Sequence, residues 1–160
     1  FSQDWARAHF RLREPRSDLA YALEAEQGGT RAILMAVQAN IIKHLLFVRS
    51  PEHTHLDSRL QQLGGQEQRE ALGAALADSL WAAGQGHGAT VCLLAAAAQF
   101  GPAPGYRADG LTERIQLFEF GDKAAVQDFI LHHIHCFREE GSHGLILFLY
   151  SLLLSRTLER

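Results

Sequence analysis

Two glycines stand directly before a segment with helical spacing of apolar residues, in the stretch Gly28-Gly29-Thr30-Arg31. The first N–H groups of a helix have no partner within the helix, and the helix dipole places partial positive charge there. A cysteine at this point would have a lowered pKa and react as a thiolate, while nearby amides could stabilise an oxyanion. The position holds Arg31 instead, and a guanidinium stays protonated and cannot act as an acyl-transfer nucleophile. The turn therefore suits an anion, but the residue supplied is a cation.

Taken by itself, this turn also has simpler interpretations. Gly28-Gly29 could be an ordinary loop that precedes a core helix. A phosphate-binding loop is disfavoured, because neither the G-x-x-x-x-G-K-S/T nor the G-x-G-x-x-G spacing is present. The local residues alone leave the role of the turn open.

A second group of side chains that could bind a metal is the run His132-His133-x-His135-Cys136. On a helix, His132 lies one turn from His135 and from Cys136, so one face could present two or three metal ligands. A zinc site usually draws ligands at fixed geometry from more than one element, and neither His87 nor His143 has a recognisable partner spacing. We therefore predict structural histidines, no metal site and no cofactor.

Cys92 and Cys136 are the two cysteines of the chain, and either could in principle replace a lost nucleophile. Cys92 lies in a small, apolar stretch typical of a buried, inert thiol, and Cys136 has no glycine-rich turn to activate it. The cysteines are far apart and form no CxxC motif, so a disulfide framework is not expected. This usage favours an intracellular, cytoplasmic protein.

The elements that must position these residues follow from the spacing of apolar side chains. Helical periodicity predicts helices over residues 32–48, 67–83 and, after a cap at Asp122, up to about Phe137. Alternation predicts a short strand at residues 19–23. Residues 111–120 also favour a strand, in which Ile115, Leu117 and Phe118 are the candidates for packing inward. Residues 89–100 and 145–154 fit either a buried strand or a helix. The fold class expected is a helix-rich α+β domain without the regular alternation of a doubly wound sheet.

Composition excludes several classes of partner. The 160 residues are 47% hydrophobic and carry a net charge of −3, with basic residues scattered, so no nucleic-acid partner is predicted. The most apolar run, residues 145–154, is shorter than the roughly 20 residues of a membrane-spanning helix, so no membrane partner is predicted. The first residue is Phe1 and not methionine, which suggests a piece of a longer protein.

Several blocks of the sequence, taken in order, resemble the MINDY deubiquitinases of the branch that contains members three and four. The first block comprises Leu19-Ala20-Tyr21, Gly28-Gly29, Ile33-Leu34-x-Ala36-Val37-Gln38 and Lys43-His44-Leu45-Leu46-Phe47. The second is Ala75-Leu76-Ala77-Asp78-Ser79-Leu80-Trp81-Ala82-Ala83-Gly84, and the third is Leu145-Ile146-Leu147-Phe148-Leu149-Tyr150-Ser151-Leu152-Leu153-Leu154-Ser155-Arg156. The resemblance spans nearly the whole chain and implies a papain-like cysteine-protease-type domain, incomplete at residues 1–160 because only its front half is present.

The departures from the family pattern fall on the residues that do its chemistry. The family's Pro-Cys-Gly aligns with Thr30-Arg31-Ala32, so Arg31 occupies the position of the nucleophile. The oxyanion glutamine, six residues before the cysteine, aligns with Ala25; Gln27 is two residues away, and no gap justifies its use. The general-base histidine of the family falls beyond Arg160. Gly28, Gly29 and Thr30 thus form a degenerate active-site turn, in the pattern of an inactive paralogue of the family.

The resemblance implies a pseudoenzyme related to isopeptidases that cleave polyubiquitin of the lysine linkage that marks proteins for the proteasome. Ubiquitin or polyubiquitin is the partner expected, because recognition surfaces are separate from the nucleophile. The alternative is an active thiol-dependent deubiquitinase that hydrolyses lysine-linked polyubiquitin with sequence outside this chain.

Overall fold

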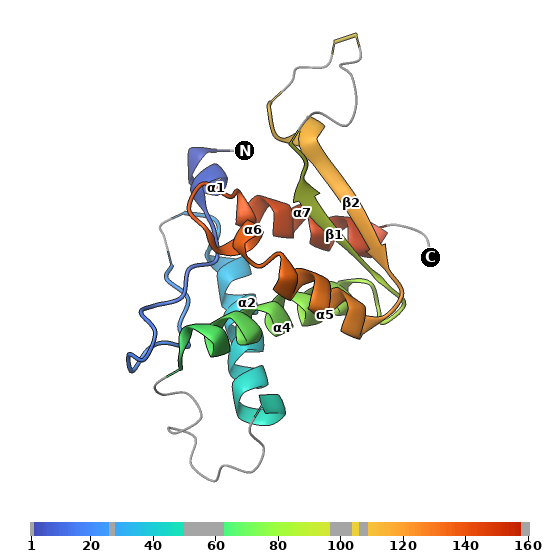
Figure 1. Cartoon of the computed structure of the whole chain (residues 1–160). Coiled ribbons are helices and arrows are strands. Elements are labelled where there is room, and N and C mark those ends of the chain that lie inside the picture. Colours follow the sequence, from blue (N-terminus) through green and yellow to red (C-terminus); the bar gives the residue numbers. More distant parts are fainter. Residues whose placement is uncertain (1, 26–27, 50–62, 97–103, 106–108, 158–160) are drawn as a thin grey trace.

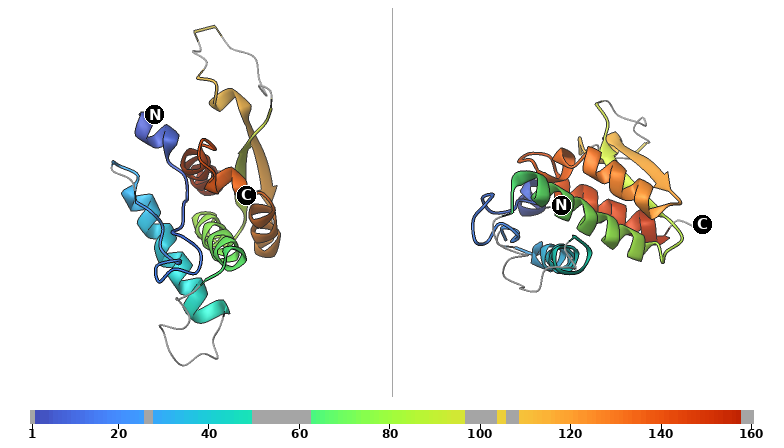
Figure 2. Two further views of the ribbon diagram at one scale, coloured as in Figure 1. Left: turned by 60° about the vertical axis from the view of Figure 1, so that its left-hand side comes forward. Right: turned by 60° about the horizontal axis from the view of Figure 1, so that its bottom comes forward.

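Helix α4 lies at the centre of the fold, between a second long helix and a two-stranded ribbon (Figures 1 and 2). The computed structural model describes residues 2–25, 28–49, 63–96, 104–105 and 109–157. The helices are α1 (Gln3–Arg7), α2 (Arg31–Lys43) continued by the π-helical η1 (His44–Arg49), α4 (Gly65–Ala83), the 3-10 turn η2 (Thr112–Arg114), α5 (Lys123–His132), α6 (His135–Arg138) and α7 (Gly144–Thr157). The strands are β1 (Ala89–Leu94) and β2 (Ile115–Phe120). The α+β class is confirmed.

The two strands pair antiparallel, with Ala89 opposite Phe120 and Leu94 opposite Ile115. Two serines of α7 bind the other edge of β1: Ser151 Oγ accepts a hydrogen bond from Cys92 N, and Ser155 Oγ accepts one from Thr90 N, both at 2.8 Å. These hydroxyls satisfy N–H groups that would be left unpaired in a buried strand. β1 is therefore fixed on both edges.

The core forms where α4 meets α2, α5 and α7. Leu72, Leu76 and Leu80, one turn apart on α4, are fully buried. The helix predicted over residues 67–83 is confirmed, with Gly84 at its end. Residues 145–154, which fitted a strand or a helix, belong to α7, whose Leu145 and Phe148 are also buried.

α2 and η1 together confirm the helix predicted over residues 32–48. The buried side chains Leu34, Val37, Ile41 and Leu45 recur every three or four residues and face the core. By length and composition alone the segment Arg31–Val48 could also cross a membrane, with a mean hydropathy of 1.4. One such helix is weak evidence, because helices of soluble proteins that pack on a core pass the same test.

Three local expectations are wrong. Residues 17–21 form turns, closed by hydrogen bonds from Ala20 N to Ser17 O and from Ala22 N to Leu19 O, and only an isolated bridge joins Leu12 to Leu23. Leu117 is 47% exposed, because Phe118 and Phe120, on the opposite face of β2, are the residues that pack against Phe129 of α5. The helix after Asp122 breaks between His132 and His135.

Asp122 does occupy the N-cap of α5, but its side chain makes no capping hydrogen bond. Pro51 and the polar residues after it predict a loop over residues 51–58, and the glycines and prolines of residues 101–110 predict another. The first of these segments and most of the second lie outside the described residues.

Candidate functional site

The segment that carries Ala25 is held against α2 by a glutamine. Gln38 Oε1 accepts a hydrogen bond from Leu23 N at 2.6 Å, and Gln38 Nε2 donates to Tyr21 O at 2.9 Å. Both backbone groups belong to one short stretch, so one side chain ties two of its residues to the middle of α2. Ala25 follows two residues after Leu23 and is thereby kept near the start of the helix.

A second glutamine ties the preceding turns to α4. Gln68 is 1% exposed, and its Nε2 donates to Arg13 O at 2.8 Å and to Ala20 O at 2.7 Å. A substitution that removes the amide of Gln68 would leave both carbonyl groups without this hydrogen-bond donor. Because the site has little access to water, the loss would lower the free energy of unfolding. The two glutamines therefore hold residues 13–23 from two helices at once.

The glycine turn before α2 has the backbone that its sequence suggests. Gly28 has a φ of +120°, which a residue with a Cβ rarely adopts, and an added Cβ would lie 3.5 Å from Asp4 Oδ2. A Cβ on Gly29 would lie 3.6 Å from Trp5 Nε1. The turn is thus packed against α1. Thr30 then caps α2 and is 1% exposed, yet its Oγ1 has no hydrogen-bond partner among the described residues.

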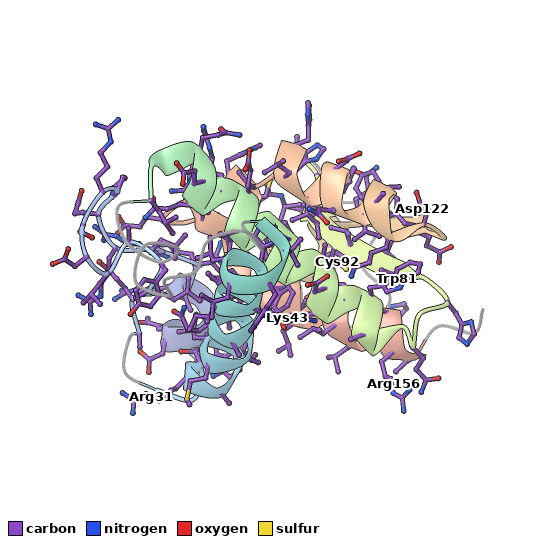
Figure 3. All side chains as sticks on the ribbon, turned by 90° about the horizontal axis from the view of Figure 1, so that it is seen from below. Arg31, Lys43, Trp81, Cys92, Asp122 and Arg156 are labelled. Carbon is purple, nitrogen blue, oxygen red and sulfur yellow. The ribbon has the colours of Figure 1, made fainter. Side chains whose placement is uncertain are left out.

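Arg31 is the first residue of α2 and is exposed. Its side chain reaches outward at the edge of the molecule (Figure 3). The first turn of α2 holds no acidic residue, and Arg31 forms no ion pair with a carboxylate in the described parts of the chain. Among the described residues, the positive charge of Arg31 thus has no carboxylate partner, and it adds to the partial positive charge at this end of the helix dipole.

A pocket of about 240 Å³ opens beside this turn. It is lined by Leu23, Ala25, Arg31, Leu34, Met35 and Gln38. The two positions that sequence reasoning singled out, Ala25 and Arg31, thus line one pocket, with apolar walls and one cation. These lining residues include no thiol, hydroxyl or imidazole that could attack a carbonyl carbon. Gln27 lies outside the described residues.

The histidine run does not assemble a metal site in the part of the chain that the structure describes. His133 Nδ1 hydrogen bonds with Phe129 O at 2.9 Å, and its ring centroid lies 4.4 Å from that of Phe129. His143 Nδ1 hydrogen bonds with Ala6 O at 2.9 Å. Nowhere in the described ranges do three His, Cys, Asp or Glu side chains come together for an ion. The histidines described here serve local packing and backbone contacts.

Neither cysteine is activated. Burial raises the pKa of the Cys92 thiol to about 11, although a hydrogen bond with Ser151 lowers it. Burial, and then the charge of Glu139, raise the pKa of Cys136, whose Sγ lies 3.5 Å from His135 Nε2. A raised pKa reduces the thiolate fraction, and the thiolate is the reactive form. Neither Cys92 nor Cys136 lines the pocket at Arg31.

The sequence did not reveal the structural roles of Gln38 and Asn40, two polar residues outside the apolar stripe of the helix predicted over residues 32–48. Asn40 Nδ2 donates to Ser79 Oγ at 2.9 Å and joins α2 to α4. The sequence held one indication of these roles, because an amide side chain beside a buried stripe can reach hydrogen-bond partners on the backbone or on other side chains. Their partners lie 15 to 39 residues away along the chain, which periodicity does not reveal.

Comparison with known proteins gives a consistent result over the whole chain. The family described as "Deubiquitinating enzyme MINDY-3/4, conserved domain" matches residues 1–160. The chain is 35% identical to the mouse (Mus musculus) protein named "Probable ubiquitin carboxyl-terminal hydrolase MINDY-4" over 99% of the chain and 21% of the relative. Proteins of the same name from Xenopus tropicalis and Homo sapiens are 33% and 32% identical over 99% of the chain and 20% of each relative.

The chain thus spans about a fifth of the length of these relatives. No solved structure matches it significantly. The match to the conserved domain covers every residue, including the glycine turn, α2 and the pocket beside Arg31. The chain therefore belongs to the MINDY-3/4 family of deubiquitinating enzymes.

Proposed function

We propose that this chain is the front half of a papain-like deubiquitinase domain that binds polyubiquitin but does not hydrolyse it. The single observation that carries the proposal is the pocket that Arg31 and Ala25 share at the start of α2. The partner proposed is polyubiquitin of the lysine linkage that marks proteins for the proteasome. The location proposed is the cytoplasm.

The chemical part of the proposal rests on what acyl transfer needs. A hydrolase of this class needs a thiolate at the helix start, a donor for the oxyanion and a base for the proton. Arg31 stays protonated and cannot attack a carbonyl carbon, and the methyl group of Ala25 cannot donate a hydrogen bond. A histidine supplied by sequence outside this chain would replace the base alone and would leave the nucleophile lost.

The binding part of the proposal rests on what remains at the same place. The glycine turn, the anchoring by Gln38 and the apolar walls of the pocket are all present without a nucleophile. Apolar contact surface contributes to binding in proportion to the area removed from water, whatever chemistry follows. The relatives are named as probable ubiquitin hydrolases, which makes ubiquitin the ligand to test.

The alternative is an active thiol-dependent deubiquitinase that hydrolyses lysine-linked polyubiquitin. The names of the relatives favour it. It requires a cysteine from sequence outside this chain to take over at the pocket beside Arg31, because Cys92 is buried and neither described thiol lines that pocket.

Titration of the full chain with tetraubiquitin of this linkage tests the binding proposal. We expect saturable binding that Met35→Glu weakens roughly tenfold or more, because a charge replaces an apolar wall of the pocket. Met35 is 65% exposed, so the substitution leaves the core intact. Leu153→Glu, at a 51% exposed position on α7 outside the pocket, is the matched control and should bind like the wild type. Absence of any interaction with the wild type would contradict the proposal.

A further inference from the structure

We propose that the pocket at Arg31 binds a free terminal carboxylate, that of ubiquitin already released from a chain, in preference to the same tail in amide linkage. This inference rests on the proposed function, since it names the form of ubiquitin that the site prefers. Hydrolysis of an isopeptide bond turns an uncharged amide carbonyl into a carboxylate. A guanidinium at the nucleophile position therefore meets a neutral group in the linked tail and an anion in the released one.

The charges at the turn favour an anion. Arg31 lines the pocket and has no carboxylate partner among the described residues, so forming a new ion pair breaks no existing one there. A planar guanidinium can donate two parallel hydrogen bonds to one carboxylate. The positive end of the α2 dipole adds to the attraction, and no acidic side chain in the first turn opposes it.

A second polar group of the same turn is also without a partner. Thr30 is 1% exposed, and its Oγ1 makes no hydrogen bond with any described residue. Buried hydroxyls are normally paired, and one left unpaired often belongs to a site whose partner is absent. Arg31 and Thr30 are adjacent, so two side chains without a partner among the described residues lie at one helix start, with Arg31 lining the pocket and Thr30 buried behind that lining.

The size and the lining of the pocket fit the end of a chain. Its volume of about 240 Å³ is below the roughly 300–1,000 Å³ of pockets for drug-sized ligands. Leu23, Leu34 and Met35 form apolar walls beside the guanidinium. A small, mostly apolar pocket with one cation suits a short tail that ends in a carboxylate.

Two ubiquitin probes that differ in one group test the inference on the full chain. One is monoubiquitin with its natural terminal carboxylate, and the other is the same protein ending in an amide. We expect the wild type to bind the carboxylate form roughly tenfold more tightly, the effect typical of one charge-assisted pair. Arg31→Gln should bring the two affinities together. Lys43→Gln removes one positive charge from the opposite end of α2, outside the pocket, and should keep the preference (Figure 3).

The outcomes separate this inference from the proposed function. Equal affinity of the wild type for both probes would overturn the carboxylate preference, and binding of amide-blocked tetraubiquitin in the same experiment would leave the proposed function standing. A preference that survives Arg31→Gln would also overturn the inference, because another cation would then be responsible. If the wild type binds neither probe nor tetraubiquitin, both the inference and the proposed function are wrong.

Discussion

Gly84→Ala is expected to lower the free energy of unfolding by about 3 kcal/mol. This is the upper end of the usual cost of adding a methyl group where the surrounding atoms are already closely packed. Gly84 caps the C-terminus of α4, where a Cβ would overlap the carbonyl oxygen of Gly88 and lie 2.9 Å from its carbonyl carbon. The obstacle is backbone, which cannot rotate away as a side chain can. The Ser155 carbonyl oxygen, 3.5 Å from the same Cβ, limits movement on the other side.

Thermal unfolding measures this effect, and a loss of this size lowers the melting temperature by roughly 6–12 °C for a chain of this length. Gly65→Ala is the matched control, because Gly65 begins the same helix and a Cβ there meets nothing within 4 Å. Alanine favours helix over glycine, so this variant should be unchanged or slightly more stable. Equal losses in the two variants would show that the close approach of Gly84 to Gly88 is not what limits this position.

Phe10→Ala is expected to lower the free energy of unfolding by about 3–5 kcal/mol, the usual cost of deleting a buried ring. Phe10 is 0% exposed, and its ring meets that of Phe148 edge to face, with centroids 5.3 Å apart. Its backbone N–H also donates to Phe137 O at 2.9 Å. The residue joins the N-terminal segment to α6 and α7, so Phe10→Ala would leave a cavity where these three parts of the chain meet.

Chemical denaturation of Phe10→Ala beside Phe47→Ala checks this prediction. Phe47 is 67% exposed, so the same substitution there should change the free energy of unfolding by less than about 0.5 kcal/mol. A small loss at Phe10 would mean that the N-terminal segment is not part of the cooperative core.

The long helices could be predicted from sequence because their buried residues recur at helical spacing. Leu34, Val37 and Ile41 mark α2 in this way, and the leucines of α4 do the same. Residues 145–154 could not be assigned, because α7 packs against β1, α4 and α6 and is apolar on most sides. A helix without a polar face shows no period.

The strand expected at residues 19–23 failed for the opposite reason. Alternating side chains there look like a strand, but local turns and Gln38 satisfy the backbone groups of this stretch, and Leu19 is 45% exposed. Apolar alternation over five residues does not reveal which partner the backbone finds. Tertiary hydrogen bonds decided the outcome.

The candidate site was only partly predictable. The glycine turn and the helix after it follow from the residues themselves, and so does the conflict between the helix dipole and Arg31. The shared pocket of Ala25 and Arg31 depends on the anchoring of residues 21–23 by Gln38, a contact across 15 to 17 positions. Spacing alone could not show that contact.

The most direct test of the central claim is a cleavage assay on the full-length protein with ubiquitin that carries a fluorogenic group on its C-terminus. With Arg31 at the start of α2, we expect no turnover above the rate in buffer, at any protein concentration and with or without a cysteine-alkylating reagent. Turnover that persists through purification and disappears on cysteine alkylation would contradict the claim, because a thiol would then be acting as the nucleophile.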